Sequence, residues 1–426
     1  MNKNLLYKLK SNRFSIGIIG LGYVGLPLSL KFVNKKINVI GFDINSKIVK
    51  QLNLKKKLHI DTIDKKFLNK NFKEYFYATT NFEKIKYVDV IIICVPTPIK
   101  NNKVPDLSFL KNTIKSIYCH LKKDQILCLE STTYPGTTRE LFGNQIKKKF
   151  QIGKEFYIGY SPERENPGKN SILEKKIPKV CSGYTSNCLK MIKILYEKIL
   201  PVKTVKSLEI AEMTKLHENI YRTINISYVN EMKMICHAFN LDIYDVISAA
   251  KTKPFGFNAF YPGPGIGGHC IPVDPFYLVW ACKKKRIKTE FINLSGRIND
   301  KLAPWILKKI KSKLNEDQKK CLLIGLSYKK NIGDTRESPS FKIADLLLKS
   351  KFKVDYHDPY LKSFPKQRSF NFRLAYKSLN RKNIRKYDFI IILTDHDNIN
   401  YELLKSNSNI IFDTRGRIKG KNVISI

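Results

Sequence analysis

Three glycines near the N-terminus, in Gly20-Leu-Gly-Tyr-Val-Gly25, restrict what this chain can fold into more than any other feature. An apolar run at 14–20 precedes them and a helical pattern follows, so they stand at a strand-to-helix turn. There, glycines permit a tight turn, a close approach of the backbone to a pyrophosphate, and packing of helix on strand. The helix N-terminus adds free N–H groups for the phosphates. We therefore prefer a dinucleotide site to an ordinary glycine turn.

Asp43 ends the next apolar run, at the spacing of about 20 residues that this kind of site requires. Its carboxylate would accept hydrogen bonds from the ribose hydroxyls and would repel a 2′-phosphate. The sequence therefore predicts NAD as the cofactor, in preference to NADP.

Short apolar runs alternate with amphipathic stretches over the first third of the chain, which is typical of a parallel sheet with crossover helices. The strands are predicted at 14–20, 38–44, 88–95, 125–130 and 156–160. A helix is predicted over 207–239, a loop rich in glycine and proline over 253–275, and further helix to about 314. A second α/β pattern has predicted strands at 321–328, 352–358, 387–395 and 409–416, and a helix at 338–350. We detect no repeat in the sequence.

These patterns predict an α/β fold with two Rossmann-like, doubly wound domains joined by a long-helix central region. The predicted domains are 1–206, which binds the dinucleotide, 207–314, which is helical and holds the glycine-rich loop, and 315–426. A chain of 426 residues is long enough for this number of domains.

The net charge of +42 does not by itself indicate a nucleic-acid partner, because lysine is spread over the whole chain. We interpret it as a solvated surface whose positive field would attract an anionic substrate. No apolar run approaches the roughly 20 residues needed to span a membrane, and the N-terminus lacks the features of a signal peptide. The nine cysteines have neither disulfide-framework nor metal-site spacing. We expect a cytoplasmic protein without metal, membrane or nucleic acid.

Cys270 lies in the glycine- and proline-rich loop 261–274, with Asp274 four residues further on. Most cysteines are small buried hydrophobic residues, but this polar, turn-rich setting indicates a nucleophile. Asp274 has an alternative interpretation as a turn former beside Pro275. For His269 we prefer a packing or substrate-contact role to that of a catalytic base.

Taken together, the motifs identify the chain as similar to the UDP-glucose/GDP-mannose dehydrogenase family, from Phe14 to near the C-terminus. Two stretches, KPFGFNAFYPGPGIGGHCIPVDPFYL and PTP…VPDLSFL, look most like bacterial UDP-N-acetylhexosamine dehydrogenases, closest to the UDP-N-acetylglucosamine 6-dehydrogenases. The motifs that carry the resemblance are GLGYVGLPLS (20–29), VPTP (95–98), ESTTYPGTT (130–138), SPER (161–164), AEMTKLHEN (211–219), GIGGHCIPVDP (265–275) and GLSYKKNIGDTRESPS (325–340).

The resemblance implies that Cys270 is the nucleophile and Asp274 the carboxylate beside it. Lys215 and Asn219 match the pair that stabilises the oxygen on which negative charge develops. They are four residues apart, so on a helix they share one face. Lys215, like Glu163, has the alternative interpretation of a surface ion-pair member.

Thr132 and Glu163 match the residues that order or activate water in the family. Many glucose-type members carry a second glutamate shortly after the SPE motif. Here the segment reads SPERENPGKN, so neither Glu165 nor Pro167 aligns with that glutamate, and its role stays unassigned.

The resemblance also implies two sets of binding contacts and makes 315–426 the UDP-sugar-binding domain. The NAD contacts are Gly20, Gly22, Tyr23, Val24, Gly25, Asp43, Pro96, Thr97 and Thr132. The nucleotide-sugar contacts are Glu163, Arg164, Lys215, Asn219, Tyr261, Gly267, Lys329 and Arg336. Lysine and arginine suit phosphate, although Arg336 has the alternative role of bracing its loop.

We therefore expect an NAD-dependent four-electron oxidation of the C6 alcohol of UDP-N-acetylglucosamine, through a thiohemiacetal and a thioester on Cys270, for surface polysaccharide precursors. UDP-N-acetylgalactosamine, UDP-N-acetylmannosamine and UDP-glucose are alternative substrates. A nucleotide-binding protein without catalysis is an alternative of another class. The resemblance and the long helix favour a homodimer formed through the central helical region.

Overall fold

The computed structural model of the chain describes residues 2–55, 60, 68–100, 103–164, 177–268, 271–367 and 369–426. Two compact units are present, Met1–Glu218 with Phe276–Ile287, and Asn219–Pro275 with Lys288–Ile426. The division into three domains at 206 and 314 remains a prediction.

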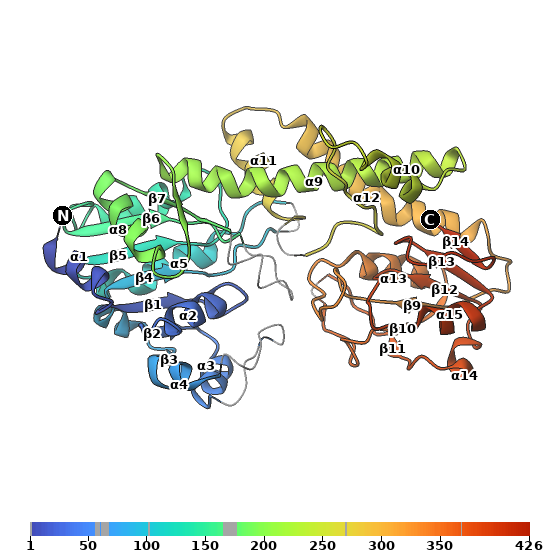
Figure 1. Ribbon diagram of the computed structural model, residues 1–426, viewed down its shortest axis with the longest axis horizontal. Coiled ribbons are helices and arrows are strands. Elements are labelled where there is room, and N and C mark those ends of the chain that lie inside the picture. The colour runs from blue at the N-terminus through green and yellow to red at the C-terminus, as the bar shows by residue number, and fades with distance from the viewer. Residues whose placement is uncertain are drawn as a thin grey trace. The chain divides into compact units, whose positions relative to one another are not determined.

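The first unit holds an eight-stranded sheet in the order β3-β2-β1-β4-β5-β6-β7-β8 (Figure 1). All neighbouring strands are parallel except β6 and β7, which are antiparallel. The strands are β1 (Ser15–Ile19), β2 (Asn38–Phe42), β3 (Phe76–Thr79), β4 (Val90–Ile93), β5 (Gln125–Leu129), β6 (Phe156–Tyr160), β7 (Lys179–Gly183) and β8 (Val202–Thr204).

Two apolar cores cover the two faces of this sheet, because successive side chains of a strand point to opposite faces. In β4, Val90 and Ile92 belong to one core, and Ile91 and Ile93 to the other. The helices and short helical turns are α1 (Lys3–Lys10), α2 (Gly25–Val33), α3 (Ser46–Asn53), α4 (Lys70–Tyr75), η2 (Phe82–Tyr87), α5 (Ser108–Ile117), η3 (Tyr118–His120), η4 (Thr138–Gly143), α6 (Asn144–Ile146) and α8 (Ser186–Tyr196).

The second unit holds a six-stranded parallel sheet in the order β11-β10-β9-β12-β13-β14 (Figure 1). Its strands are β9 (Lys320–Ile324), β10 (Lys353–His357), β11 (Ala375–Tyr376), β12 (Phe389–Ile392), β13 (Ile410–Asp413) and β14 (Val423–Ser425). The remaining helices of the chain are α9 (Leu208–Ala238), α10 (Ile243–Ala250), α11 (Asp274–Lys284), α12 (Glu290–Lys311), α13 (Pro339–Lys349), α14 (Arg381–Ile384) and α15 (Tyr401–Asn407).

These sheets confirm the predicted α/β, doubly wound class. When the strands of each sheet are numbered in chain order, the second sheet has the spatial order 3-2-1-4-5-6. The first sheet has the same order as far as β6, and this is the order of a dinucleotide-binding fold. In such sheets ligands bind at the carboxyl ends of the strands, where the strand order reverses. That point lies between β1 and β4 in the first sheet and between β9 and β12 in the second.

The predicted helix 207–239 is α9, and the predicted helix 338–350 is α13, which Ser338 caps. The helix predicted to run to about 314 is two helices, α11 and α12, because the chain turns at 285–289. The strands β3, β7, β8, β11 and β14 were not predicted. No helix within the described ranges is both long and apolar enough to cross a membrane.

The glycine turn allows a test of the fold. A Cβ at Gly25 would lie 1.9 Å from the backbone oxygen of Gly20, whereas one at Gly22 would meet no heavy atom of the described chain within 4 Å. We expect Gly25→Ala to lower the free energy of unfolding by about 1–3 kcal/mol or more, the usual cost of overpacking, and Gly22→Ala to leave it nearly unchanged. Chemical denaturation of both variants measures this, and equal losses would contradict the role assigned to Gly25.

Candidate active site

The glycine turn is held by the aspartate that follows β2. Leu21 N–H donates to Asp43 Oδ2 (2.9 Å), and Asn45 N–H donates to Asp43 Oδ1 (2.8 Å). Asp43 itself is half-buried, so its carboxylate remains within reach of a ligand. Within the part of the chain that the structure describes, Gly22 borders open space, and no side chain caps the start of α2. A turn with room for a pyrophosphate, an uncapped helix start and a half-buried carboxylate fits a dinucleotide.

The other predicted NAD contacts follow neighbouring strands of the same sheet. Pro96 and Thr97 come after β4, and Thr132 comes after β5. Pro96 is exposed, Thr97 is buried and Thr132 is half-buried. Because β1, β4 and β5 are parallel neighbours, these residues share the carboxyl edge of the sheet with the glycine turn. Tyr23, within that turn, is 43% exposed.

Lys215 and Glu163 are in direct contact. Lys215 Nζ donates to the backbone oxygen of Glu163 at 2.5 Å, and Lys215 is only 8% exposed. The alternative interpretation of Lys215 as a surface ion-pair member is therefore wrong, because this lysine is buried and binds a carbonyl group. Glu163 does belong to an ion pair, but its partner is a buried lysine.

The Glu163 carboxylate contacts a lysine that we did not single out in the sequence. Lys179 Nζ lies 3.0 Å from Glu163 Oε2 and 2.7 Å from Glu130 Oε2. For Glu163, burial raises the pKa, but Lys179, together with more distant lysines, outweighs burial, and the net pKa is lower than usual. For Glu130, burial prevails over Lys179 and the pKa is raised. Glu163 is therefore the carboxylate that stays ionised most readily.

The Arg164 guanidinium group contacts helix α9. Its Nη2 lies 2.6 Å from Glu218 Oε1, its Nε donates to Glu218 Oε2 (3.1 Å), and its Nη1 donates to the backbone oxygen of Pro178 (3.0 Å). These contacts anchor the SPER segment to α9. The predicted contact between Arg164 and the substrate remains a prediction.

In the second unit, Asn219 and Asp274 are paired. Asn219 Nδ2 donates to Asp274 Oδ2 at 2.5 Å, and both residues are buried. One turn along α9, Thr223 Oγ1 donates to the backbone oxygen of Ile271 (3.0 Å). Asp274 begins α11, and its bond to Asn219 goes beyond the role of a turn former. The predicted nucleophile Cys270 lies outside the described residues, as do His269, Glu165 and Pro167.

The segment before Cys270 packs against the segment after β9. Gly268 N–H donates to the backbone oxygen of Arg336 (3.0 Å), and a Cβ at Gly267 would lie 2.7 Å from the Tyr328 side chain. The Arg336 guanidinium contacts Asp334, with Nη2 at 2.6 Å from Oδ2. These contacts support the bracing role of Arg336. Lys329 is half-buried, and Tyr261 is 54% exposed.

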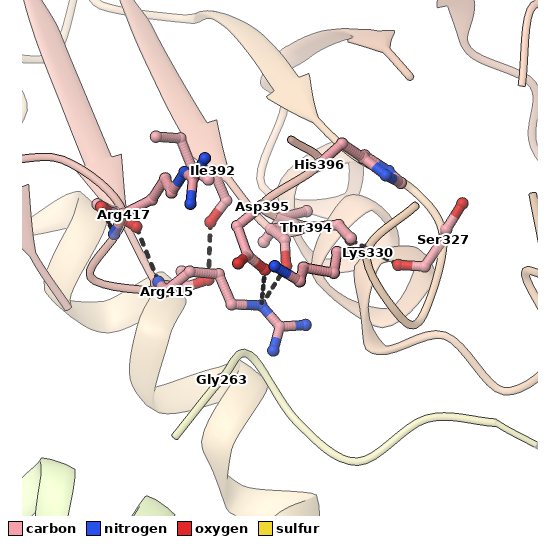
Figure 2. A network of polar contacts seen from close by, with 12 residues as sticks. Gly263, Ser327, Lys330, Ile392, Thr394, Asp395, His396, Arg415 and Arg417 are labelled. Carbon is pink, nitrogen blue, oxygen red and sulfur yellow. Dashed lines mark hydrogen bonds and ion pairs between the residues drawn. The ribbon is translucent and has the colours of Figure 1, made fainter. Parts of the chain in front are cut away.

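Arg415, another residue not singled out in the sequence, lies at the carboxyl ends of β12 and β13 (Figure 2). Its Nε donates to the backbone oxygen of Leu393 (2.8 Å) and lies 3.8 Å from Asp395 Oδ1. A Cβ at Gly263 would lie 2.6 Å from Arg415 Nη1, so a larger residue there would require the guanidinium group to shift. The result is an arginine held beside the glycine-rich loop.

Comparison with known proteins gives matches along almost the whole chain. Residues 14–200 match the NAD binding domain of the UDP-glucose/GDP-mannose dehydrogenase family, 209–301 its central domain and 322–420 its UDP binding domain. The chain belongs to this family. It is therefore an oxidoreductase with NAD as its cofactor, and the predicted family, enzyme class and cofactor are confirmed.

Several relatives of this dehydrogenase cover nearly the same length. The chain is 33% identical to a UDP-N-acetyl-D-mannosamine dehydrogenase from Methanocaldococcus jannaschii, covering 94% of this chain and 92% of the relative. It is 35% identical to a UDP-N-acetyl-D-glucosamine 6-dehydrogenase from Pseudomonas aeruginosa, covering 81% and 83%. The solved structure of a UDP-D-N-acetylmannosamine dehydrogenase from Pyrococcus horikoshii superposes with a TM-score of 0.82 at 28% identity, covering 95% and 96%.

The dehydrogenase carries a further buried carboxylate on α9 that we did not predict. Glu212 is fully buried and accepts from the backbone N–H of Gly136 (2.6 Å) and of Thr138 (2.8 Å), and from Thr138 Oγ1 (2.7 Å). It thereby ties the ESTTYPGTT segment, which includes Thr132, to the helix that carries Lys215. Burial raises the pKa of Glu212 to about 7, although these donors lower it.

This shift predicts a pH dependence of stability. Because the pKa of Glu212 is higher in the folded protein than its ordinary value of 4.5, its contribution to stability is complete below that value and is lost as the pH rises through about 7. The free energy of unfolding of the wild type relative to Glu212→Gln should fall across this window, at up to about 1.4 kcal/mol per pH unit. Denaturation at a series of pH values measures it, and parallel curves would refute the assignment.

Proposed function

We propose that this dehydrogenase oxidises the C6 alcohol of a UDP-N-acetylhexosamine to the uronate in two successive oxidations, supplying precursors of surface polysaccharides. The sequence motifs favour UDP-N-acetylglucosamine as the substrate, and the Pseudomonas aeruginosa relative supports this choice. The two N-acetylmannosamine enzymes named above support the epimer as the alternative. UDP-N-acetylgalactosamine and UDP-glucose are further alternatives within the same chemistry.

The hydrogen bond between Asn219 and Asp274 carries this proposal. It places an amide donor and a buried carboxylate together, and Asp274 follows the predicted nucleophile by four residues. Lys215 lies one helical turn before Asn219 on α9. A cation and an amide donor on one helix face suit an oxygen that gains negative charge. An alcohol oxidised first to an aldehyde and then to an acid passes through such an oxygen twice.

In the proposed mechanism, a water held by Asp274, or neutral Lys215, takes the proton of the C6 hydroxyl group. NAD, when bound by the glycine turn and Asp43, accepts the hydride that each oxidation releases. The Cys270 thiolate adds to the aldehyde carbon, and Lys215 and Asn219 stabilise the oxyanion of the thiohemiacetal. The second oxidation leaves a thioester on Cys270. Water positioned by Glu163 and Thr132 then releases the acid.

Stoichiometry tests the function, because an ordinary alcohol dehydrogenase stops at the aldehyde and yields one NADH per sugar. We expect two NADH per UDP-N-acetylglucosamine, the uronate as product and little free aldehyde. A panel of UDP-sugars, read by NADH absorbance and by the mass of the product, measures this. If UDP-N-acetylmannosamine is the preferred substrate, the assigned epimer changes but the proposed reaction stands.

Cys270→Ala is the matched control in this experiment, and it should make no acid while still binding NAD. A ratio of one with accumulated aldehyde would contradict the thioester route. If none of the sugars is turned over although NAD binds, a nucleotide-binding protein without catalysis would be favoured.

We further propose that the enzyme is a homodimer formed through α9. Tyr221, Tyr228 and Ile235 are spaced seven residues apart on this helix and are 44%, 56% and 43% exposed. Large apolar side chains in such a row favour a helix partner. The family resemblance and the length of α9 support a second copy of the chain as that partner.

Tyr228→Asp tests the dimer, because a charge at the centre of the row would have to be buried in the interface. We expect the wild type to have the mass of a dimer in light scattering and the variant that of a monomer. Tyr7→Asp, at an exposed position in α1, is the matched control. A monomeric wild type, or a dimeric Tyr228 variant, would rule out this interface.

A further inference from the structure

The buried ion cluster of the first unit contains more than the proposed mechanism uses. Lys179 is the first residue of β7, and its side chain is 5% exposed. It contacts Glu130, whose side chain is 0% exposed, at the end of β5, and Glu163, at 16%, in the segment after β6. Among the described residues, the ammonium group therefore bridges two carboxylates from different parts of the chain.

The surroundings hold each member of this cluster in one orientation. The Tyr196 hydroxyl donates to Glu130 Oε1, and Lys179 Nζ lies 5.4 Å from the centre of the Tyr196 ring. The backbone N–H of Lys179 donates to the oxygen of Pro201 (2.7 Å), which fixes the start of β7. Lys215 holds the backbone of Glu163, as described above. Glu163 is thus held at its main chain by one lysine and at its carboxylate by another.

A buried ion pair is weak evidence of a purely stabilising role, because desolvation offsets most of the Coulomb energy. Retaining a buried lysine between two carboxylates is easier to explain if one of the carboxylates must stay charged and oriented. Glu163 is the carboxylate of this cluster that has a role in the proposed mechanism.

We propose that Lys179 is a positioning residue for the last chemical step, and that it holds Glu163 as an oriented carboxylate for hydrolysis of the Cys270 thioester. The proposal rests on the proposed function. In this step, the oxygen of water forms a bond to the thioester carbon, and the carbon–sulfur bond breaks. The sugar leaves as a carboxylate, the cysteine regains a thiol, and one proton passes to the solvent through Glu163.

The charges of the neighbourhood agree with this role. Burial raises the pKa of Glu163, but Lys179, Lys31 and Lys215 together outweigh burial and lower this pKa, with Lys179 contributing most of the lowering. Burial instead raises the pKa of Glu130. In the resting cluster, a bound proton would therefore reside on Glu130, which leaves Glu163 charged and able to accept the proton of the water.

Loss of Lys179 should then slow hydrolysis and spare the two oxidations. We expect Lys179→Met to release a rapid burst of two NADH per subunit, followed by turnover slowed about a hundredfold, as misplacement of a reacting group typically does. Intact-mass measurement of the quenched protein should show the sugar acyl group bound to it. Lys179→Arg should restore most of the turnover, because it keeps the positive charge.

Two further variants serve as controls in the same measurement with UDP-N-acetylglucosamine and NAD. Glu163→Gln should also accumulate the acyl-protein, because it removes the group that Lys179 positions. Lys233→Met removes another buried lysine, which binds the backbone oxygen of Thr414 (3.0 Å), and it should accumulate none. Accumulation in the Lys233 variant would mean that the loss of any buried lysine has this effect, and would overturn the proposal.

Lys179→Met leaves two carboxylates buried without their cation, so it can fail to fold. The double variant Glu130→Gln/Lys179→Met removes one charge of each sign and avoids this. If the double variant accumulates the acyl-protein, the positioning role is supported. If it or the single variant hydrolyses the thioester at the wild-type rate, Lys179 is only structural and the proposal fails. A wild type that makes one NADH per sugar would instead refute the proposed function itself.

Discussion

One face of α9 buries seven polar side chains, and a buried polar group costs free energy unless it is hydrogen-bonded. Each of them therefore has to hold another part of the chain in place. Toward the start of the helix these parts are the segments after β5 and β6, and further along they are the glycine-rich loop, α12 and the segment after β13. The residues are Glu212, Lys215, Asn219, Thr223, Ser227, Asn230 and Lys233. They recur every three or four residues, which is the spacing of one helix face. The helix thus orders its own site residues and the loops they contact through the same interactions.

The two sheets use one interaction to shape the turn after their first strand, and they use it with different results. In the second sheet, Leu326 N–H donates to Asp358 Oδ2 (2.8 Å), as Leu21 does to Asp43 in the first. Asp358, however, is fully buried and also contacts His396 Nε2 (3.2 Å). Its carboxylate is therefore committed to the protein, whereas that of Asp43 is half-buried. Ser327 and Lys330 stand where the first turn has Gly22 and Gly25. The second turn consequently lacks two of the three glycines of the dinucleotide-binding turn, so it does not match the pattern of a second dinucleotide site.

The sequence was sufficient for those features that depend on local pattern. The glycine turn, Asp43, α9, α13 and most buried strands follow from periodicity and from residues close in sequence. Five strands were missed because they are short, lie at or near the sheet edges or, like β7, carry too little local pattern. Lys179 could not be found, since its partners are 49 and 16 residues away and nothing beside it in the sequence indicates burial. The sequence predicted the Rossmann-like class of both sheets but not which strands pair, because pairing between distant strands is not marked by repeated residues.

In a chain with 78 lysines and arginines, composition cannot distinguish a lysine that acts from one that is solvated. Among the described residues, burial singles out Lys179, Lys215 and Lys233, and their partners then decide their charge. Lys179 faces two carboxylates, which overcome the effect of burial and raise its pKa above the usual value. Lys233 binds a backbone oxygen, and burial lowers its pKa to about 7 in spite of the charge of Asp413. A lysine side chain is therefore a stable cation at position 179 in one unit, whereas at position 233 in the other unit it loses its proton far more easily. The difference comes from the groups that the fold places around it, so roles for lysine in this protein have to be argued from contacts.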